Sequence, residues 1–205
     1  MKWNKKILLS VVLLVSLVSL SACQSITNWW KNTKEEWIGL EMTVRTFDEN
    51  SQLIDEMSGK SLSISRNQEF DSVDAEGYSN SDSSVLKVTL GNYEIDHVGS
   101  SLIAAEEGLE DLYAKYQTTV DIANYDRSIP LVNRMVSSLK NDFTGKAKVV
   151  LIRSQNGTPL ATYVGDKVSL YASDAPKTSE LLLDGKRLII YRCDYTIYDR
   201  ELSEN

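Results

Sequence analysis

Residues 147–165, AKVVLIRSQNGTPLATYVG, form the clearest strand, turn and strand pattern in the chain. Two mainly apolar runs flank Asn156-Gly157, a dipeptide that tight hairpin turns favour because both residues tolerate a positive φ. A short loop joins antiparallel neighbours, since parallel strands need long crossover connections. The stretch therefore predicts an antiparallel hairpin, and the segments on either side extend the same pattern.

The C-terminal side continues with KVSLYAS (167–173), a Pro-containing loop, SELLL (179–183) and RLIIYRCDYTIYD (187–199). Asp184-Gly185 between the last two runs gives a second hairpin turn. We interpret 187–199 as one alternating final strand.

The N-terminal side predicts about six more strands. Residues 38–47 alternate between apolar and polar side chains. With 53–57 and 60–65, joined through DENSQ (48–52) and a Ser58-Gly59 turn, they predict a three-stranded meander through residue 65.

The polar stretch 66–84, rich in Ser, Asp and Asn, predicts a long surface loop. Two further strands, 85–90 and 92–98, are joined by Gly91-Asn92.

Two segments have helical features. Residues 101–116 fit either a helix or, as we favour, a strand at 101–105 followed by a short helical turn near 109–116. Residues 128–144 predict the main amphipathic helix: apolar residues recur at helical spacing, with Ser128 as N-cap and Gly145 ending the pattern. The resulting fold class is α+β and mostly antiparallel β, with a curved sheet, sandwich or barrel-like arrangement covered or filled by that helix.

The first 22 residues have the pattern of a secretory signal peptide. Lys2, Lys5 and Lys6 precede an uncharged apolar run at 7–20, and small residues follow at Ser21 and Ala22. A run of about 14 residues is too short for a hydrocarbon core of about 30 Å. A short transmembrane anchor is the alternative.

Leu20-Ser21-Ala22-Cys23 resembles the bacterial lipobox. The resemblance implies cleavage before Cys23 and attachment of acyl chains, of the palmitate type, at that residue. Two chains hold a protein stably at a membrane because each buried methylene contributes about 0.8 kcal/mol. The expected location is the extracytoplasmic face of the cell membrane. An ordinary secreted protein in which Cys23 is incidental is the alternative.

The segment after Cys23 contains Trp29, Trp30 and Trp37 near helical spacing, which predicts a helix at about 25–36. The tryptophans either lie at the lipid headgroups or pack on the domain. The expected organisation is a signal peptide at 1–22, a lipid anchor and Trp-rich tether at 23–37, and one mostly β domain at 38–205.

Composition disfavours nucleic acid as a partner. The chain has 22 Lys and Arg against 29 Asp and Glu, a net charge of −7. Loss of three signal-peptide lysines makes the mature chain still more acidic, whereas phosphate neutralisation needs clustered basic residues.

Few residues offer catalytic or metal chemistry. His97 is the only histidine, so a zinc site is disfavoured. Asp96, Ser100 and Ser101 near it do not make a catalytic triad by their proximity in sequence. The acids of the 71–82 loop, Asp71, Asp74, Glu76 and Asp82 around Gly77, miss the EF-hand spacing; we expect a solvated acidic loop, with calcium as the alternative. No cofactor motif is present in the sequence.

Cys193 and the tyrosines of the C-terminal strands complete the candidates. With Cys23 acylated, Cys193 has no intramolecular disulfide partner, and its alternating context predicts a buried position. The tyrosines, Tyr163, Tyr171, Tyr191, Tyr195 and Tyr198, either face the core, which we favour, or form an exposed row for a glycan or protein.

The lipobox, the Trp-rich segment, WIGLEMTVRTFDEN (37–50), HVGSSLI (97–103) and LLLDGKRLIIYRCDYTIYD (181–199) resemble a family of uncharacterised Gram-positive, streptococcal-type surface lipoproteins that share a domain of unknown function. The resemblance implies a surface lipoprotein and supplies no catalytic residues. We expect a non-enzymatic module that binds or scaffolds an envelope protein or cell-wall glycan. A small wall-active hydrolase using acidic residues is the alternative, and the solute receptor of an importer is disfavoured because the repeated βα pattern is absent from the sequence.

Overall fold

The computed structural model describes residues 39–77, 79–119 and 148–199. The signal peptide, Cys23, the expected helix at about 25–36 and the expected helix at 128–144 lie outside these residues. Within the described part, the helices are too short and too polar to cross a membrane.

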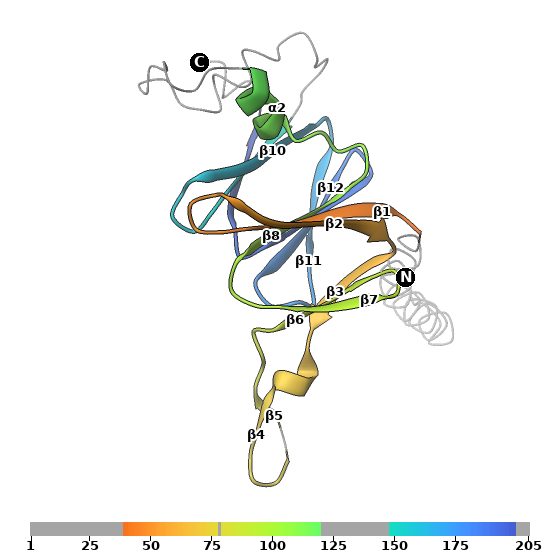
Figure 1. The fold of residues 1–205 in the computed structure, drawn as a ribbon, viewed down its shortest axis with the longest axis vertical. Helices are drawn as coiled ribbons and strands as arrows, with labels where there is room; N and C mark the ends of the chain where they lie inside the picture. Colours follow the sequence, from red (N-terminus) through yellow and green to blue (C-terminus); the bar gives the residue numbers. More distant parts are fainter. Residues whose placement is uncertain (1–38, 78, 120–147, 200–205) are drawn as a thin grey trace, which may run out of the picture. The chain divides into compact units, whose positions relative to one another are not determined.

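A six-stranded antiparallel sheet forms the centre of the fold (Figure 1). Its strands, in spatial order, are β11 (Val168–Ala172), β12 (Thr178–Leu183), β13 (Lys186–Tyr191), β8 (Ser101–Glu106), β1 (Glu41–Phe47) and β2 (Leu53–Lys60). β8 and β13 lie next to each other in the middle, although about 80 residues separate them in the chain. Two hairpins, β1–β2 and β12–β13, are thereby joined into one sheet.

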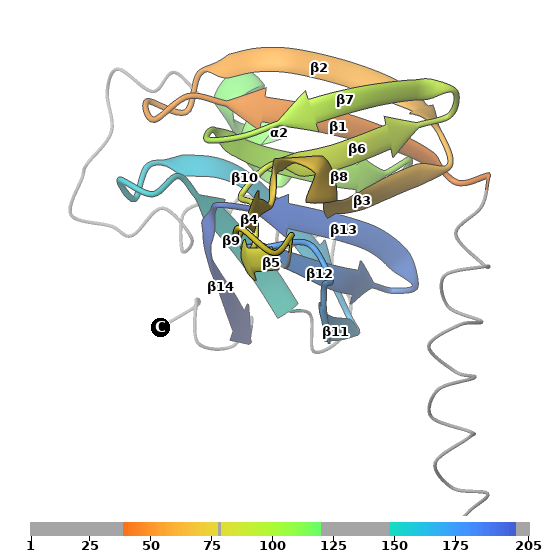
Figure 2. The ribbon, with the colours of Figure 1, turned by 90° about the horizontal axis from the view of Figure 1, so that it is seen from below.

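Both faces of this sheet are covered by smaller antiparallel sheets, seen from two directions in Figures 1 and 2. One has the order β3 (Leu62–Arg66), β6 (Leu86–Leu90) and β7 (Tyr93–His97). The other has the order β10 (Pro159–Gly165), β9 (Lys148–Arg153) and β14 (Asp194–Asp199). The fold is therefore a layered β structure.

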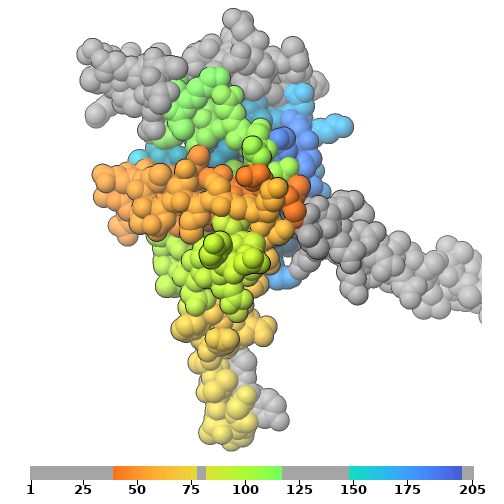
Figure 3. Space-filling view, turned by 45° about the vertical axis from the view of Figure 1, so that its right-hand side comes forward, coloured from red at the N-terminus to blue at the C-terminus, as the bar shows by residue number. Residues whose placement is uncertain are grey.

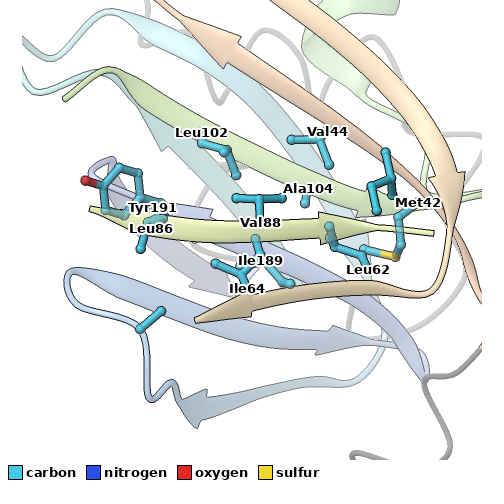
Figure 4. Close-up of a cluster of buried hydrophobic side chains, with 12 residues drawn as sticks. Met42, Val44, Leu62, Ile64, Leu86, Val88, Leu102, Ala104, Ile189 and Tyr191 are labelled. Carbon is cyan, nitrogen blue, oxygen red and sulfur yellow. The ribbon is translucent and has the colours of Figure 1, made fainter. Parts of the chain in front are cut away.

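Alternate side chains of the central strands enter two different cores. Val44, Ala104 and Ile189 pack with the β3–β6–β7 sheet (Figure 4), and Ile103 and Leu188 pack with the β9–β10–β14 sheet. Because the side chains of a strand alternate between the two faces, a central strand covered on both faces is apolar at nearly every position. This explains the continuous runs LIA at 102–104 and LII at 188–190.

The helix α2 (Leu112–Thr119) lies on the outer side of the β9–β10–β14 sheet, where Tyr116 packs with Val149 and Leu151. A small hairpin formed by β4 (Ser72–Val73) and β5 (Ser79–Ser81) follows the 3-10 helix η1 (Gln68–Phe70). This hairpin projects away from the sheets, as the lower yellow element of Figures 1 and 3. We call residues 67–82 the arm.

The structure confirms the mostly antiparallel β class, and its layers match the sandwich option, since none of the described sheets closes into a barrel. The hairpin of 147–165, the strands around Gly91-Asn92, the strand at 101–105 and the helical turn after it are also confirmed.

Three predictions are wrong in part. The meander fails because Ser58 and Gly59 belong to β2, and the chain turns at Ser61, where φ is 61°, to place β3 beside β6 in another sheet. Leu62 and Ile64 thereby reach the core, whereas a third strand beside β2 would leave that apolar pair at an exposed edge.

Residues 187–199 form two strands instead of one. Arg192, with φ of 51°, breaks the run between β13 and β14, which belong to different sheets. The segment 66–84, expected to be a loop, instead contains the short β4–β5 hairpin of the arm. The ladder between β4 and β5 gives some of its backbone polar groups hydrogen-bond partners.

We predict that Ile189→Ala lowers the free energy of unfolding by about 2–5 kcal/mol, because it leaves a cavity in the middle of the central sheet. Ile189 is 0% exposed, whereas Leu170 on edge strand β11 is 56% exposed. Urea denaturation of both variants checks this. Leu170→Ala is the control, with a change within about 0.5 kcal/mol. Equal losses in the two variants would contradict the assigned core.

Candidate functional site

A polar groove of about 520 Å³ opens where the arm meets the β11–β12 loop. Arg66 and Asp82 line it from the base of the arm, and residues 173–179 line it from the loop. Segments about 100 residues apart in the chain thus form one recess.

The loop side of the groove is held by the core and by backbone hydrogen bonds. Ala175 is 3% exposed and packs among the residues beneath the β3–β6–β7 sheet. Lys177 has φ of 54°, and its carbonyl accepts a hydrogen bond of 3.1 Å from the N–H of Arg192. The turn between β11 and β12 is therefore held both by the packing of Ala175 and by the backbone hydrogen bond of Lys177.

The arm side is organised by Arg66. Its guanidinium contacts the carboxylate of Asp71 at 3.2 Å and also that of Asp82. Its Nε is buried and has no hydrogen-bond partner among the described residues. One cation therefore holds together the two ends of the arm, because Asp71 precedes β4 and Asp82 follows β5.

Backbone-directed hydrogen bonds complete the base of the arm. Ser83 donates from its hydroxyl to the carbonyl of Asn67 at 2.8 Å, and from its N–H to Asp71 at 2.8 Å. The side chain of Asn67 donates to Asp96 at 2.7 Å. Asn67 and Ser83 are both buried, so this polar network replaces an apolar core at the base of the arm.

The groove contains charges of both signs and several hydroxyls. Lys177 and Asp82 are exposed, while the hydroxyls of Ser173 and Thr178 donate to Glu180 at 3.0 Å and to the carbonyl of Pro176 at 3.1 Å. The hydroxyl of Ser179 accepts from Tyr195. Such a lining suits a polar ligand that both donates and accepts hydrogen bonds.

A buried ion pair supports the groove from below. Arg187 donates to Glu180 at 3.1 Å, with side chains 7% and 13% exposed. Burial lowers the pKa of Arg187, while the carboxylate of Glu180 opposes this change. Arg187 also donates to the carbonyl of Leu62 at 3.3 Å, so the pair joins β12 and β13 to β3 across the layers.

A second charged cluster lies at the start of α2. One carboxylate oxygen of Asp111 accepts backbone hydrogen bonds from Tyr113, Ala114 and Thr162, and Arg45 lies 3.7 Å from the other. Burial raises the pKa of Asp111, although these donors oppose the change. Asp111 is thus the N-terminal cap of α2 and ties the helix to β10.

Arg45 and Tyr163 complete this cluster. Burial disfavours the Arg45 cation, but the hydrogen bond that Arg45 donates to Glu56 at 2.7 Å and the neighbouring negative charges together outweigh it, so the pKa of Arg45 is raised. Burial also raises the pKa of Tyr163, whose ring is 1% exposed. These groups link strands β1, β2 and β10 to helix α2.

His97 contacts a backbone carbonyl and a buried tyrosine. Its Nε2 lies 3.0 Å from the carbonyl of Ser100, and its ring meets that of Tyr191 edge-on at 5.5 Å. Asp96 points to the other face of β7 and accepts from Asn67, and Ser101 donates to the carbonyl of Arg192. The structure therefore does not bring Asp96, His97 and the two serines together as a catalytic unit.

Cys193 is half-buried between β13 and β14, with its thiol 3.2 Å from the carbonyl of Tyr191. Burial raises the pKa of Cys193 to about 12, so the thiol stays protonated at neutral pH. It lies outside a strand, unlike the sequence-based expectation.

The tyrosines do not form an exposed row. Tyr163 and Tyr191 are buried, Tyr195 and Tyr198 pack at the margins of two cores, and Tyr171 is half-exposed on edge strand β11. This agrees with the favoured interpretation that most of them face the core.

The acids of the 71–82 loop do not converge on one point. Asp71 and Asp82 contact Arg66, Asp74 accepts from the N–H of Glu76 at 3.1 Å, and Glu76 is exposed. Across the described residues, no group of three or more His, Cys, Asp or Glu side chains has a metal-binding arrangement.

Sequence reasoning missed the groove, since its two sides meet only in the folded chain. The turn residues Asp174, Pro176 and Lys177 and the lone arginine ahead of the acidic stretch were the available signals.

A family model for a domain of unknown function, DUF5052, matches residues 5–203. The chain belongs to the DUF5052 family. No curated protein and no solved structure matches this DUF5052 chain. Family membership thus agrees with the expected domain of unknown function and assigns no activity.

We predict that Asp111→Ala lowers the free energy of unfolding by roughly 1–3 kcal/mol, because buried N–H groups lose their acceptor. Asp111→Asn keeps an acceptor at the same position and costs less. The folded pKa of Asp111 lies above the unfolded value near 3.8, so the native state takes up the proton first as the pH falls.

The free energy of unfolding of the wild type should therefore rise relative to that of Asp111→Asn as the pH falls towards 3.8. The rise is complete below that pH. Denaturant titrations of both proteins between neutral and acid pH measure the difference. A difference that does not vary with pH would contradict the raised pKa.

Proposed function

We propose that this DUF5052 chain is a lipid-anchored, non-enzymatic binding module at the extracytoplasmic face of a bacterial, Gram-positive membrane. The lipobox-like sequence Leu20-Ser21-Ala22-Cys23 at the end of an apolar run supports the anchor. The anchor is acyl chains on Cys23, and the domain faces the cell envelope.

The groove between Arg66 and the 173–179 loop carries the proposed binding role. It is open, polar and of mixed charge, and its hydroxyls are held by internal hydrogen bonds. Held groups keep their geometry when a ligand binds, which lowers the entropic cost of association. An envelope protein or a cell-wall glycan is the proposed ligand.

The candidate catalytic groups support binding over hydrolysis. The raised-pKa carboxyl of Asp111 caps a helix, His97 contacts a backbone carbonyl, and the thiol of Cys193 is protonated and half-buried. General acid–base catalysis needs such groups within reach of a substrate.

We predict that the wild-type protein, expressed in its native host with an alkyne-bearing fatty acid, incorporates the label. Cys23→Ala should abolish labelling, because the acylated atom is removed. Gel fluorescence of the immunoprecipitated protein measures this. Cys193→Ala is the matched control and should keep full labelling; label retained in Cys23→Ala would contradict the anchor.

We predict that a benzophenone side chain at position 176, in the groove of the full-length protein in cells, forms a reproducible adduct on illumination. Protease sensitivity of the adduct assigns a protein ligand, and a mobility shift after muramidase digestion assigns a glycan. The same probe at position 170, on exposed edge strand β11, is the control. Equal adducts at both positions, or none, would contradict binding at the groove.

A further inference from the structure

The arm exposes apolar side chains that the fold does not use. Phe70 is 56% exposed and Val73 is 60% exposed, and both belong to the element that projects from the sheets in Figure 3. Single exposed apolar residues are ordinary on a protein surface. Phe70 and Val73, however, lie within four residues of each other on an element that projects from the sheets. No sheet or helix of the described chain covers either side chain.

The arm is held by polar contacts at its base. Arg66 bridges Asp71 and Asp82, and Ser83 hydrogen bonds to Asn67 and Asp71. A two-stranded hairpin alone is marginally stable in water, so these contacts replace the apolar packing that other hairpins use. Phe70 and Val73 therefore do not stabilise the arm by burial, and their apolar surface is available to a partner.

The charge of the arm selects the kind of partner. Residues 66–82 contain five acidic residues and one basic residue, Arg66. Arg66 contacts two of the carboxylates, Asp71 and Asp82, and the other three, Glu69, Asp74 and Glu76, belong to residues that are exposed along the arm. A second copy of this arm would be repelled by the same charges, whereas a cationic surface would be attracted.

We propose that the arm docks a basic protein segment in which apolar side chains alternate with lysine or arginine. The apolar side chains of the segment cover Phe70 and Val73, and its cations lie beside Glu69, Asp74 and Glu76. This inference deepens the proposed binding role, but it depends neither on the groove nor on Cys23. Loss of arm binding and loss of groove adducts can therefore be observed separately.

The test uses the full-length protein in detergent and a fluorescein-labelled synthetic peptide, KRLKFKRG, followed by fluorescence polarisation. A second peptide, KRSKSKRG, has the same charge without the apolar side chains. We expect the first peptide to bind about tenfold more tightly than the second, a difference of about 1.4 kcal/mol, because its apolar side chains act as anchors at the centre of the interface. Equal affinities would overturn the proposal.

Variants of the arm identify the surface. Phe70→Ser with Val73→Ser should weaken binding of the first peptide about tenfold. The matched control, Val98→Ser with Leu170→Ser, changes two side chains that are 59% and 56% exposed elsewhere and should leave binding unchanged. Thermal unfolding of each variant establishes that the fold persists. Equal weakening by both pairs would overturn the assignment to the arm.

Charge is tested in the same way. Glu69→Gln, Asp74→Asn and Glu76→Gln together should weaken binding about tenfold at low salt and reduce its salt dependence. Glu49→Gln, Glu107→Gln and Asp166→Asn remove the same charge from exposed positions elsewhere and should have little effect. A similar loss in this control would show that net charge alone attracts the peptide and would overturn the proposal.

Two other occupants are also tested. Self-association of the full-length protein that Phe70→Ser with Val73→Ser abolishes would assign the arm to a second copy. Flotation of a Cys23→Ala protein with zwitterionic phosphatidylcholine vesicles, lost in the same arm variant, would assign it to a lipid surface. Either result would overturn docking of a basic segment.

Discussion

The pairing of β8 with β13 is the contact on which the other layers depend. Leu102 lies opposite Tyr191, and Ala105 lies opposite Leu188, so the two strands join hairpins from opposite ends of the described chain. Their side chains then supply both cores, one on each face of the sheet. A slip of one residue in this register would exchange the two faces and leave neither flanking sheet with its own partners.

The polar groups buried between the layers fix how the sheets are placed on this foundation. Arg187 joins β12 and β13 to β3 through Glu180 and the carbonyl of Leu62. Asp111 joins α2 to β10 in the same manner, through a carboxylate that accepts backbone hydrogen bonds. Removing one partner of a buried pair leaves an uncompensated charge, which is strongly destabilising. Such contacts therefore favour the one arrangement of the sheets in which both partners meet.

The features available to partners lie away from this core. The groove and the arm share Asp82, which contacts Arg66 at the base of the arm, and both features are organised by charge and hydrogen bonds. Ala175 is the groove residue that also packs in a core of the sheets. The proposed anchor, groove and arm would place the domain at a membrane, hold a polar ligand and attract a basic segment, respectively.

The amount of the fold that could be predicted follows the range of the interactions. Local signals identified the strands and hairpins, because Asn156-Gly157, Asp184-Gly185 and Gly91-Asn92 specify turns within a few residues. They failed at Ser61 and Arg192, where a non-glycine residue takes a positive φ and the chain passes from one sheet to another. Nothing in the local sequence requires a change of direction at either position. The change is required because the strand that follows must be buried in another sheet.

The same division holds for the candidate site. The sequence by itself determined the β class, the acidic character, the family resemblance and the lipobox-like position of Cys23, since these depend on composition and short-range pattern. Only the tertiary structure decided that Arg66 meets the 173–179 loop, that His97 lies against Tyr191, and that Phe70 remains exposed. Those outcomes depend on strand pairing across the chain, which brings distant residues together and decides which of them water still reaches.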